Sequence, residues 1–166
     1  MKELLKDYTK YNIWANERIC KVLEPIPEVL DKEQKSSFTS IRKTIYHIWD
    51  SEFIWIKRLQ GKSLNEGPSK TFNGSFLEFQ NDFLGGSGKF FMYVINKESR
   101  DLEKELSYKN IKGEPFSNKI YYIIQHVVNH STFHRGQIIT MLRNAGVTVL
   151  PSTDFIVYIR EAGEAK

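Results

Sequence analysis

The chain has 166 residues, with 24 lysines and arginines against 20 aspartates and glutamates, 40% hydrophobic residues and a single cysteine. This length and composition predict one soluble globular domain over residues 1–166. The apolar runs are far shorter than the roughly 20 residues that cross a bilayer, and the charged N-terminus does not resemble a secretory signal. Cys20 alone cannot form an intrachain disulfide, which favours the reducing cytoplasm.

The net charge of +4 arises from basic residues that alternate with acidic ones, as where Lys32 and Lys35 flank Glu33. No basic stripe is evident along the chain. This pattern is typical of a solvated mixed surface and disfavours a nucleic-acid-binding track.

A helix is predicted first, over about residues 2–24. Its apolar residues step by three or four positions and mark one face: Leu4, Tyr8, Tyr11, Ala15, Ile19 and Val22. Pro25 ends the helix. Cys20 lies roughly 120° from the centre of this face and no activating base is identified for it, so we interpret it as incidental rather than nucleophilic.

A polar connector over residues 31–39 leads to Ser40, a good N-cap for a second helix. This long, aromatic helix has an apolar stripe and is closed by Gly61. The stripe consists of Ile41, Ile45, Ile48, Trp49, Ile56 and Leu59.

After a loop over residues 61–75, an aromatic-rich pattern predicts a third helix from about Phe76 to Ile95. The stretch Gly85–Gly88 contains three glycines, each about 1 kcal/mol less favourable than alanine in a helix. We therefore expect the third helix to be kinked or split at this stretch.

Residues 105–117 predict either a small hairpin or an ordered loop before the fourth long helix. That helix runs from about Asn118 to Asn144 and stops at Gly146, and a short helix ends near Gly163. Helices with one apolar face each predict an all-α fold, an antiparallel four-helix bundle with a short C-terminal helix.

The histidines are the most informative residues in the sequence. His47 belongs to the second helix, whereas His126, His130 and His134 recur every four residues in the fourth. These three spread over about 80° of one helix face, on the stripe that we expect to point into the bundle. A buried imidazole without a partner is costly, and a bound cation would satisfy it.

Spacing leaves two ligand pairs open. His126 and His134 lie about 12 Å apart along the axis, too far to share an ion, so the pair is either His126 with His130 or His130 with His134. A single interior histidine is more often a core residue than a ligand, but three on one stripe reverse that expectation. No glutamate lies between His130 and His134, which disfavours a zinc protease.

A third ligand must come from elsewhere. His47 is the remaining histidine, although it lies roughly 140° from the centre of its helix stripe, and Asp50 and Glu52 compete with it. Gln137 shares the histidine face and either hydrogen-bonds a metal-bound ligand or satisfies a buried backbone group. Arg135 points about 100° away, which favours a structural or interface salt bridge.

Several motifs resemble those of the DinB family of metal-binding four-helix-bundle proteins. The resemblance lies in residues Tyr11–Asn16, Ser40–His47, Pro151–Tyr158 and, most specifically, the run HVVNHSTFHRGQ at His126–Gln137. Within the first motif, we assign Trp14 and Asn16 to packing and hydrogen bonding. The match covers nearly the whole chain, and the glycine stretch of the third helix is its main departure.

The resemblance implies one divalent metal ion, nickel or zinc, held by His47, His130 and His134, with His126 either beside the site or in the core. It also implies a homodimer. Related proteins with the same fold and metal triad are transferases that use low-molecular-weight thiols such as bacillithiol or mycothiol.

Three imidazoles leave an open coordination position, the mark of a catalytic metal. We therefore expect thiol activation: the cation holds a low-molecular-weight thiolate that attacks a small electrophile. A hydrolase that activates water at the same site is one alternative. A metal-binding dimeric bundle without turnover, acting in sensing or storage, is the other.

Overall fold

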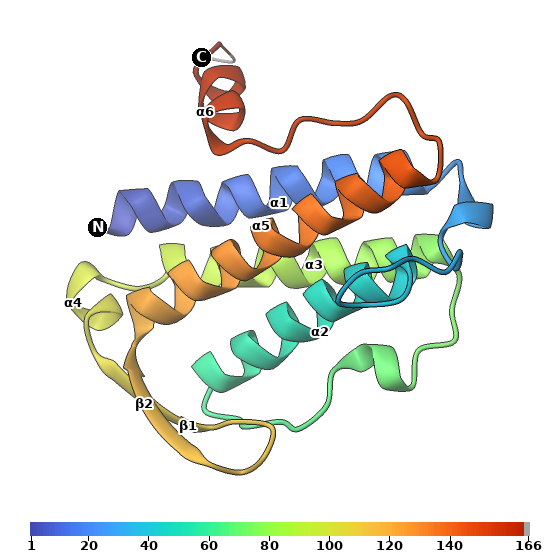
Figure 1. Cartoon of the computed structure of the whole chain (residues 1–166). Helices are drawn as coiled ribbons and strands as arrows, with labels where there is room; N and C mark the ends of the chain where they lie inside the picture. The colour runs from blue at the N-terminus through green and yellow to red at the C-terminus, as the bar shows by residue number, and fades with distance from the viewer. Residues whose placement is uncertain (165–166) are drawn as a thin grey trace.

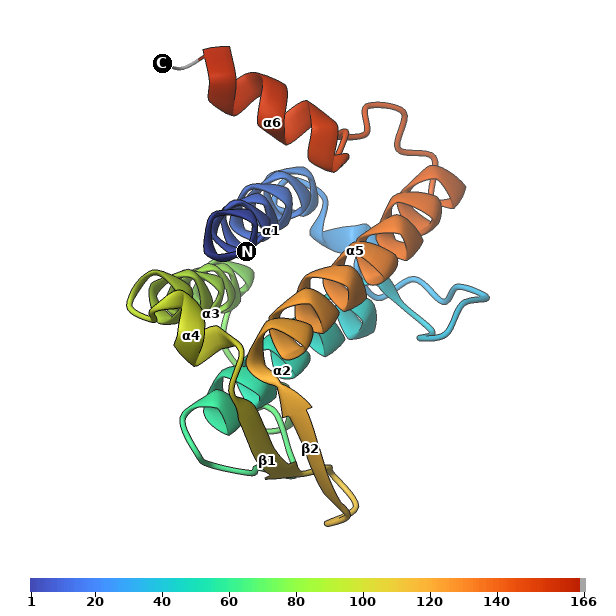
Figure 2. The ribbon, with the colours of Figure 1, turned by 90° about the vertical axis from the view of Figure 1, so that its left-hand side faces the viewer.

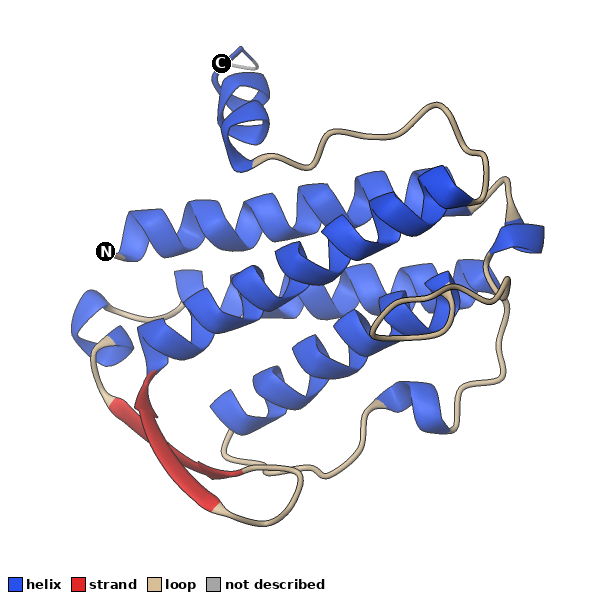
Figure 3. Ribbon diagram, in the orientation of Figure 1, coloured by secondary structure: helices blue, strands red, loops and turns tan. Residues whose placement is uncertain are grey.

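A computed structural model describes residues 1–164, and its long helices form a bundle (Figure 1). Short elements connect or extend them, including a two-stranded hairpin (Figure 3). In chain order the elements are α1 (Lys2–Leu23), η1 (Pro27–Val29), α2 (Ile41–Leu59), η2 (Pro68–Lys70), α3 (Phe76–Ile95), α4 (Ser99–Leu102), β1 (Glu105–Lys109), β2 (Pro115–Lys119), α5 (Ile120–Asn144) and α6 (Phe155–Glu164). The predicted all-α bundle is confirmed.

Helices α1 and α5 run in one direction and α2 and α3 in the other (Figure 1). Helix α1 packs against α3 and α5, while α2 packs against α5 and α3. Helix α6 lies outside the bundle against α1, as the rotated view shows (Figure 2). No helix within residues 1–164 is both long enough and apolar enough to cross a membrane.

Local signals set the helix ends much as the sequence indicates. The Ser40 side chain accepts a hydrogen bond from the Lys43 backbone N–H at the start of α2. Ser75 and Glu78 form a capping box at the start of α3. Gly61 and Gly146 follow α2 and α5 with φ of 81° and 89°, a region that favours glycine.

The expected break at Gly85–Gly88 does not occur, because α3 is one continuous helix across these residues. Ser87 is buried there, and its Oγ donates to Glu52 Oε2 at 2.6 Å. Phe83 and Phe90 on either side are also buried. Tertiary packing and this hydrogen bond compensate for the low helix propensity of glycine.

Of the two forms predicted for residues 105–117, the structure has the hairpin. Strands β1 and β2 pair antiparallel from Glu105 opposite Lys119 to Lys109 opposite Pro115. Because residues 118 and 119 belong to β2, α5 begins at Ile120, two residues later than expected. The hairpin therefore leads directly into the helix that carries three histidines.

Three apolar clusters of buried residues are present, and a polar layer lies between the two larger ones. One cluster contains Ile19, Leu23, Phe79 and Phe83 toward one end, and the other contains Leu5, Phe90, Val94 and Ile124 toward the opposite end. The polar layer consists of Asn12, Asn16, Glu52, Ser87, Ser131 and Arg135, all buried.

Glu52 and Arg135 are the charged members of this polar layer, with exposed fractions of 2% and 0%. Arg135 Nη1 donates to Oδ1 of Asn12 and of Asn16, at 2.7 Å each. The Nδ2 groups of the same asparagines donate to Glu52 Oε1 at 2.7 and 3.0 Å, and Ser131 Oγ donates to it at 3.1 Å. The two asparagines thus bridge a buried positive and a buried negative charge.

Two expectations are corrected by this layer. Arg135 makes no salt bridge within the described residues, and it lies in the core because the surrounding amides and hydroxyls accept its hydrogen bonds. Glu52, which the sequence offered as a competing metal ligand, is instead buried in this layer, where α1, α3 and α5 each supply donors to it. Asn16, which we expected to take part in hydrogen bonding, forms hydrogen bonds with both Glu52 and Arg135.

We expect Glu52→Leu to lower the free energy of unfolding by about 3–5 kcal/mol, because it leaves the Arg135 guanidinium buried without a compensating charge. Urea denaturation of the variant and the wild type would measure this difference in the free energy of unfolding. Glu33→Ala, at an exposed position, should change stability by less than about 0.5 kcal/mol.

The double variant Glu52→Leu with Arg135→Met should lose clearly less stability than the sum of the single variants, since it removes both charges. Additive losses, or a Glu52→Leu cost below about 1 kcal/mol, would contradict the proposed coupling.

Candidate metal centre

Three histidines from two helices converge at the contact between α2 and α5. His47 lies on α2, and His130 and His134 lie one turn apart on α5. Their ligand atoms all lie within 4.8 Å of one another. His134 is buried, whereas His47 and His130 are half-buried, so the cluster lies at the edge of the bundle.

The nitrogen spacing matches that of ligands around one ion. His130 Nε2 lies 3.0 Å from His47 Nε2 and 3.2 Å from His134 Nε2. In tetrahedral zinc sites, bonds of about 2.0–2.1 Å separate two nitrogen ligands by roughly 3.3 Å. These two spacings are therefore close to those of nitrogen ligands that share one divalent ion.

Gln137 contacts His134, and its amide oxygen favours the tautomer with the proton on Nδ1. Its Oε1 lies 2.7 Å from His134 Nδ1, and its Nε2 donates to Ser37 Oγ at 2.9 Å. With the proton on Nδ1, the Nε2 lone pair of His134 points at His130. Gln137 thus contacts an imidazole of the triad, a partner that the sequence did not indicate.

Burial and the neighbouring histidines favour the neutral forms of His47 and His130. The pKa of His130 is lowered to about 3 by burial and by the neighbouring histidines. Burial and His134 also lower the pKa of His47, with Asp50 opposing them. Each imidazole offers one ring nitrogen to the cluster, and one bound cation would satisfy the three nitrogens at once.

The connector between α1 and α2 covers one side of the triad. The Phe38 ring lies 4.5 Å from the His47 ring and 5.6 Å from the His134 ring, centroid to centroid. Sequence reasoning missed this residue. The feature that could have identified it is that Phe38 is the one apolar residue in the polar segment 31–39.

The other candidate ligands do not join the cluster of ligand atoms. His126 is exposed rather than inward, which corrects the expectation that all three α5 histidines share the buried stripe. The buried positions of α5 run through Val127, Ser131 and Arg135, so His126 lies at the edge of that face. Asp50 instead accepts hydrogen bonds from the backbone N–H and hydroxyl of Ser69.

Cys20 is fully buried in an apolar cluster, although the helix wheel placed it away from the apolar face. Helix α1 contacts both α3 and α5, and its buried arc is therefore broader than one stripe. Burial raises the pKa of the Cys20 thiol to about 12. Such a thiol stays protonated at neutral pH, which agrees with an incidental role.

Comparison with known proteins identifies one family along the full length. The family model described as "DinB family" matches residues 1–166. Protein DinB of Bacillus subtilis (strain 168) is 32% identical over 158 residues, covering 90% of each chain.

We expect Cys20 to resist Ellman's reagent in the native protein at neutral pH, because its thiol is both buried and protonated. After unfolding in guanidinium chloride, one thiol per chain should react. Rapid reaction of the native protein would contradict the burial of this side chain.

Proposed function

The chain belongs to the DinB family, and from that premise we propose that it binds one divalent metal ion, nickel or zinc, through His47, His130 and His134. We further propose that it is an enzyme that activates a low-molecular-weight thiol for transfer to a small electrophile. The convergence of three imidazoles whose ligand atoms lie within 4.8 Å of one another carries the metal proposal.

The donor set suits the proposed metals, because imidazole is a good ligand for nickel and zinc. A divalent ion bound by three protein ligands would supply a Lewis acid with an open coordination position, which lowers the pKa of a thiol or water there. The protein's own contribution is to hold three lone pairs in place before the ion arrives.

Residues around the triad support this arrangement in different ways. Gln137 keeps the proton of His134 on Nδ1, so that Nε2 stays available as a ligand. Phe38 packs against two imidazoles and excludes water from that side. The exposed His126 side remains accessible to small molecules.

The chain supplies no thiol of its own to the triad. Its single cysteine, Cys20, is buried in the core with a raised pKa. A thiol that reacts at the triad therefore has to come from a separate small molecule, which supports an exogenous thiol as co-substrate.

We also propose that the protein forms a homodimer and acts in the cytoplasm. Exposed apolar side chains on α1 and α6, such as Leu4, Ile156 and Ile159, support a self-association surface. The lone free thiol of Cys20 is typical of proteins from a reducing compartment.

The first test is the metal content per chain, measured by elemental mass spectrometry on untagged protein after incubation with nickel or zinc. We expect near-stoichiometric metal in the wild type and in His126→Ala, and its loss in His47→Ala, His130→Ala and His134→Ala. Conjugation of free cysteine to 1-chloro-2,4-dinitrobenzene would then assay turnover.

Two results would overturn parts of this proposal. An empty wild type, or metal loss in His126→Ala alone, would reject the triad. Full metal loading with no thiol conjugation but with ester hydrolysis would replace the transferase by a hydrolase.

Gln137→Leu should weaken zinc binding by about 10–100-fold, because His134 loses the partner that fixes its tautomer. Competition with a chromophoric chelator would measure the affinity. Gln125→Leu makes the same change at an exposed position of α5 and should bind zinc like the wild type. Equal affinity in both variants would contradict the role assigned to Gln137.

A further inference from the structure

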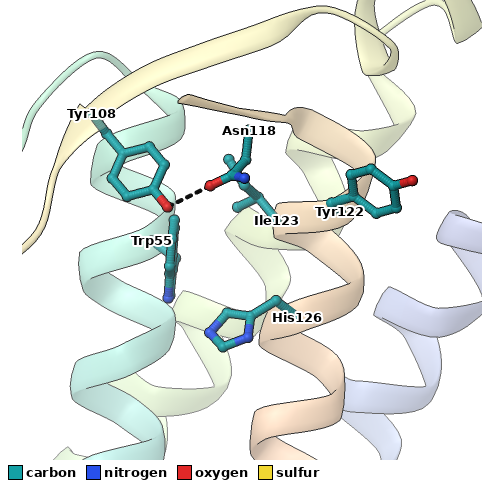
Figure 4. A pocket seen from close by; sticks show the side chains of 6 residues that line it. All are labelled: Trp55, Tyr108, Asn118, Tyr122, Ile123 and His126. Atoms are coloured by element: carbon teal, nitrogen blue, oxygen red, sulfur yellow. Dashed lines mark hydrogen bonds between the residues drawn. The ribbon is translucent and has the colours of Figure 1, made fainter. Parts of the chain in front are cut away.

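A pocket of about 270 Å³ lies beside the triad, between α2, the hairpin and α5. Trp55 comes from α2, Tyr108 and Asn118 come from the two strands, and the other lining side chains come from α5 (Figure 4). Its lining residues are Trp55, Tyr108, Asn118, Tyr122, Ile123 and His126. The walls are thus mainly aromatic, and none of them carries a carboxylate.

His126 connects this pocket to the triad. Its ring centroid lies 5.4 Å from that of Trp55 and 5.8 Å from that of His130. His126 and His130 are neighbours one helical turn apart on α5, so the pocket and the triad follow one another along the same side of the helix. A small molecule in the pocket can therefore reach toward the triad.

A buried positive charge lies against two walls of the pocket. Arg58 is only 6% exposed, and its guanidinium lies 4.4 Å from the ring centroid of Trp55 and 5.2 Å from that of Tyr108. Within residues 1–164 no carboxylate forms an ion pair with Arg58. Its buried Nε also has no hydrogen-bond partner there.

This situation is unusual, because buried charges are normally paired. The other buried guanidinium, that of Arg135, has several acceptors and a nearby carboxylate in the polar layer. Stacking on two rings stabilises a cation but leaves its charge uncompensated.

The pocket also presents a hydrogen-bond donor. Asn118 Oδ1 accepts from Tyr108 Oη at 2.7 Å, as Figure 4 shows, which turns the carbonyl end of Asn118 toward the tyrosine. Its Nδ2 group is left to donate to a ligand. The pocket therefore suits a ligand with a negatively charged hydrogen-bond acceptor. Such a ligand would meet the Asn118 donor, the aromatic walls and the uncompensated charge of Arg58.

We propose that this pocket binds a small anion with an aromatic or apolar body, its carboxylate drawn toward the charge of Arg58 and its body against Trp55 and Tyr108. The pocket thereby selects negatively charged substrates for the triad, and this selection rests on the proposed function. Binding in the pocket does not depend on a metal, so it can be tested separately.

The test uses the full chain, both treated with a chelator and loaded with zinc, and titrates it with benzoate or with its neutral analogue benzamide. Nuclear magnetic resonance of the Trp55 indole N–H, assigned with Trp55→Phe, reports binding in the pocket. Arg58→Met removes the charge, and Lys57→Met removes the same charge from the neighbouring residue as a matched control.

We expect benzoate to shift the Trp55 signal with and without zinc, and to bind at least about tenfold more tightly than benzamide. Arg58→Met should weaken benzoate binding by at least about tenfold and leave benzamide binding unchanged. Lys57→Met should bind both like the wild type. The wild-type comparison of the two ligands needs no folded variant.

Equal binding of benzoate and benzamide, or no shift of the Trp55 signal, would overturn the proposal. The proposal would also be overturned if benzoate bound only in the presence of zinc and bound Arg58→Met as tightly as the wild type. The carboxylate would then be a metal ligand. Benzoate binding without zinc in a protein that takes up no metal would support the anion pocket and reject the metal proposal.

Discussion

The buried pair of Glu52 and Arg135 constrains the rest of this bundle. A fully buried guanidinium is tolerated only if its charge and its N–H groups are compensated. Asn12 and Asn16 bridge it to the carboxylate, and Ser87 adds a donor from α3. All four long helices contribute to this layer, which restricts the rotation of each helix about its own axis.

That restriction also orients the triad. With Arg135 facing the core, the preceding residue His134 lies on the adjacent side of α5, toward α2. His130 lies one turn earlier on the same side, and His47 meets both from α2. A polar layer that carries no metal thus positions the residues that we propose to hold one.

The connector, the histidine triad and the pocket follow one another along the contact between α2 and α5. The connector with Phe38 covers His47 and His134, His130 follows, and His126 leads on to the pocket beneath the hairpin. One side is closed by packed aromatic rings, and the other opens into a pocket next to an uncompensated cation. This order provides separate places for the proposed ion and for a small anion.

Periodicity and capping residues predict the helices, the bundle and most helix ends, because these depend on interactions within about four residues along the chain. They also restrict a shared metal to neighbouring histidines of α5. The family motifs indicate His47, His130 and His134, which the structure brings together.

Only the tertiary structure shows which side chains meet across helices. A helix wheel describes the angle of a residue about its own axis, but not which neighbour lies opposite. For that reason the helix wheel did not assign His47, predicted that His126 faces the interior and predicted that Arg135 faces away from it. In the structure His126 is exposed and Arg135 is buried. The continuity of α3 through its glycines was likewise decided by contacts from α2, since local propensity alone opposed it.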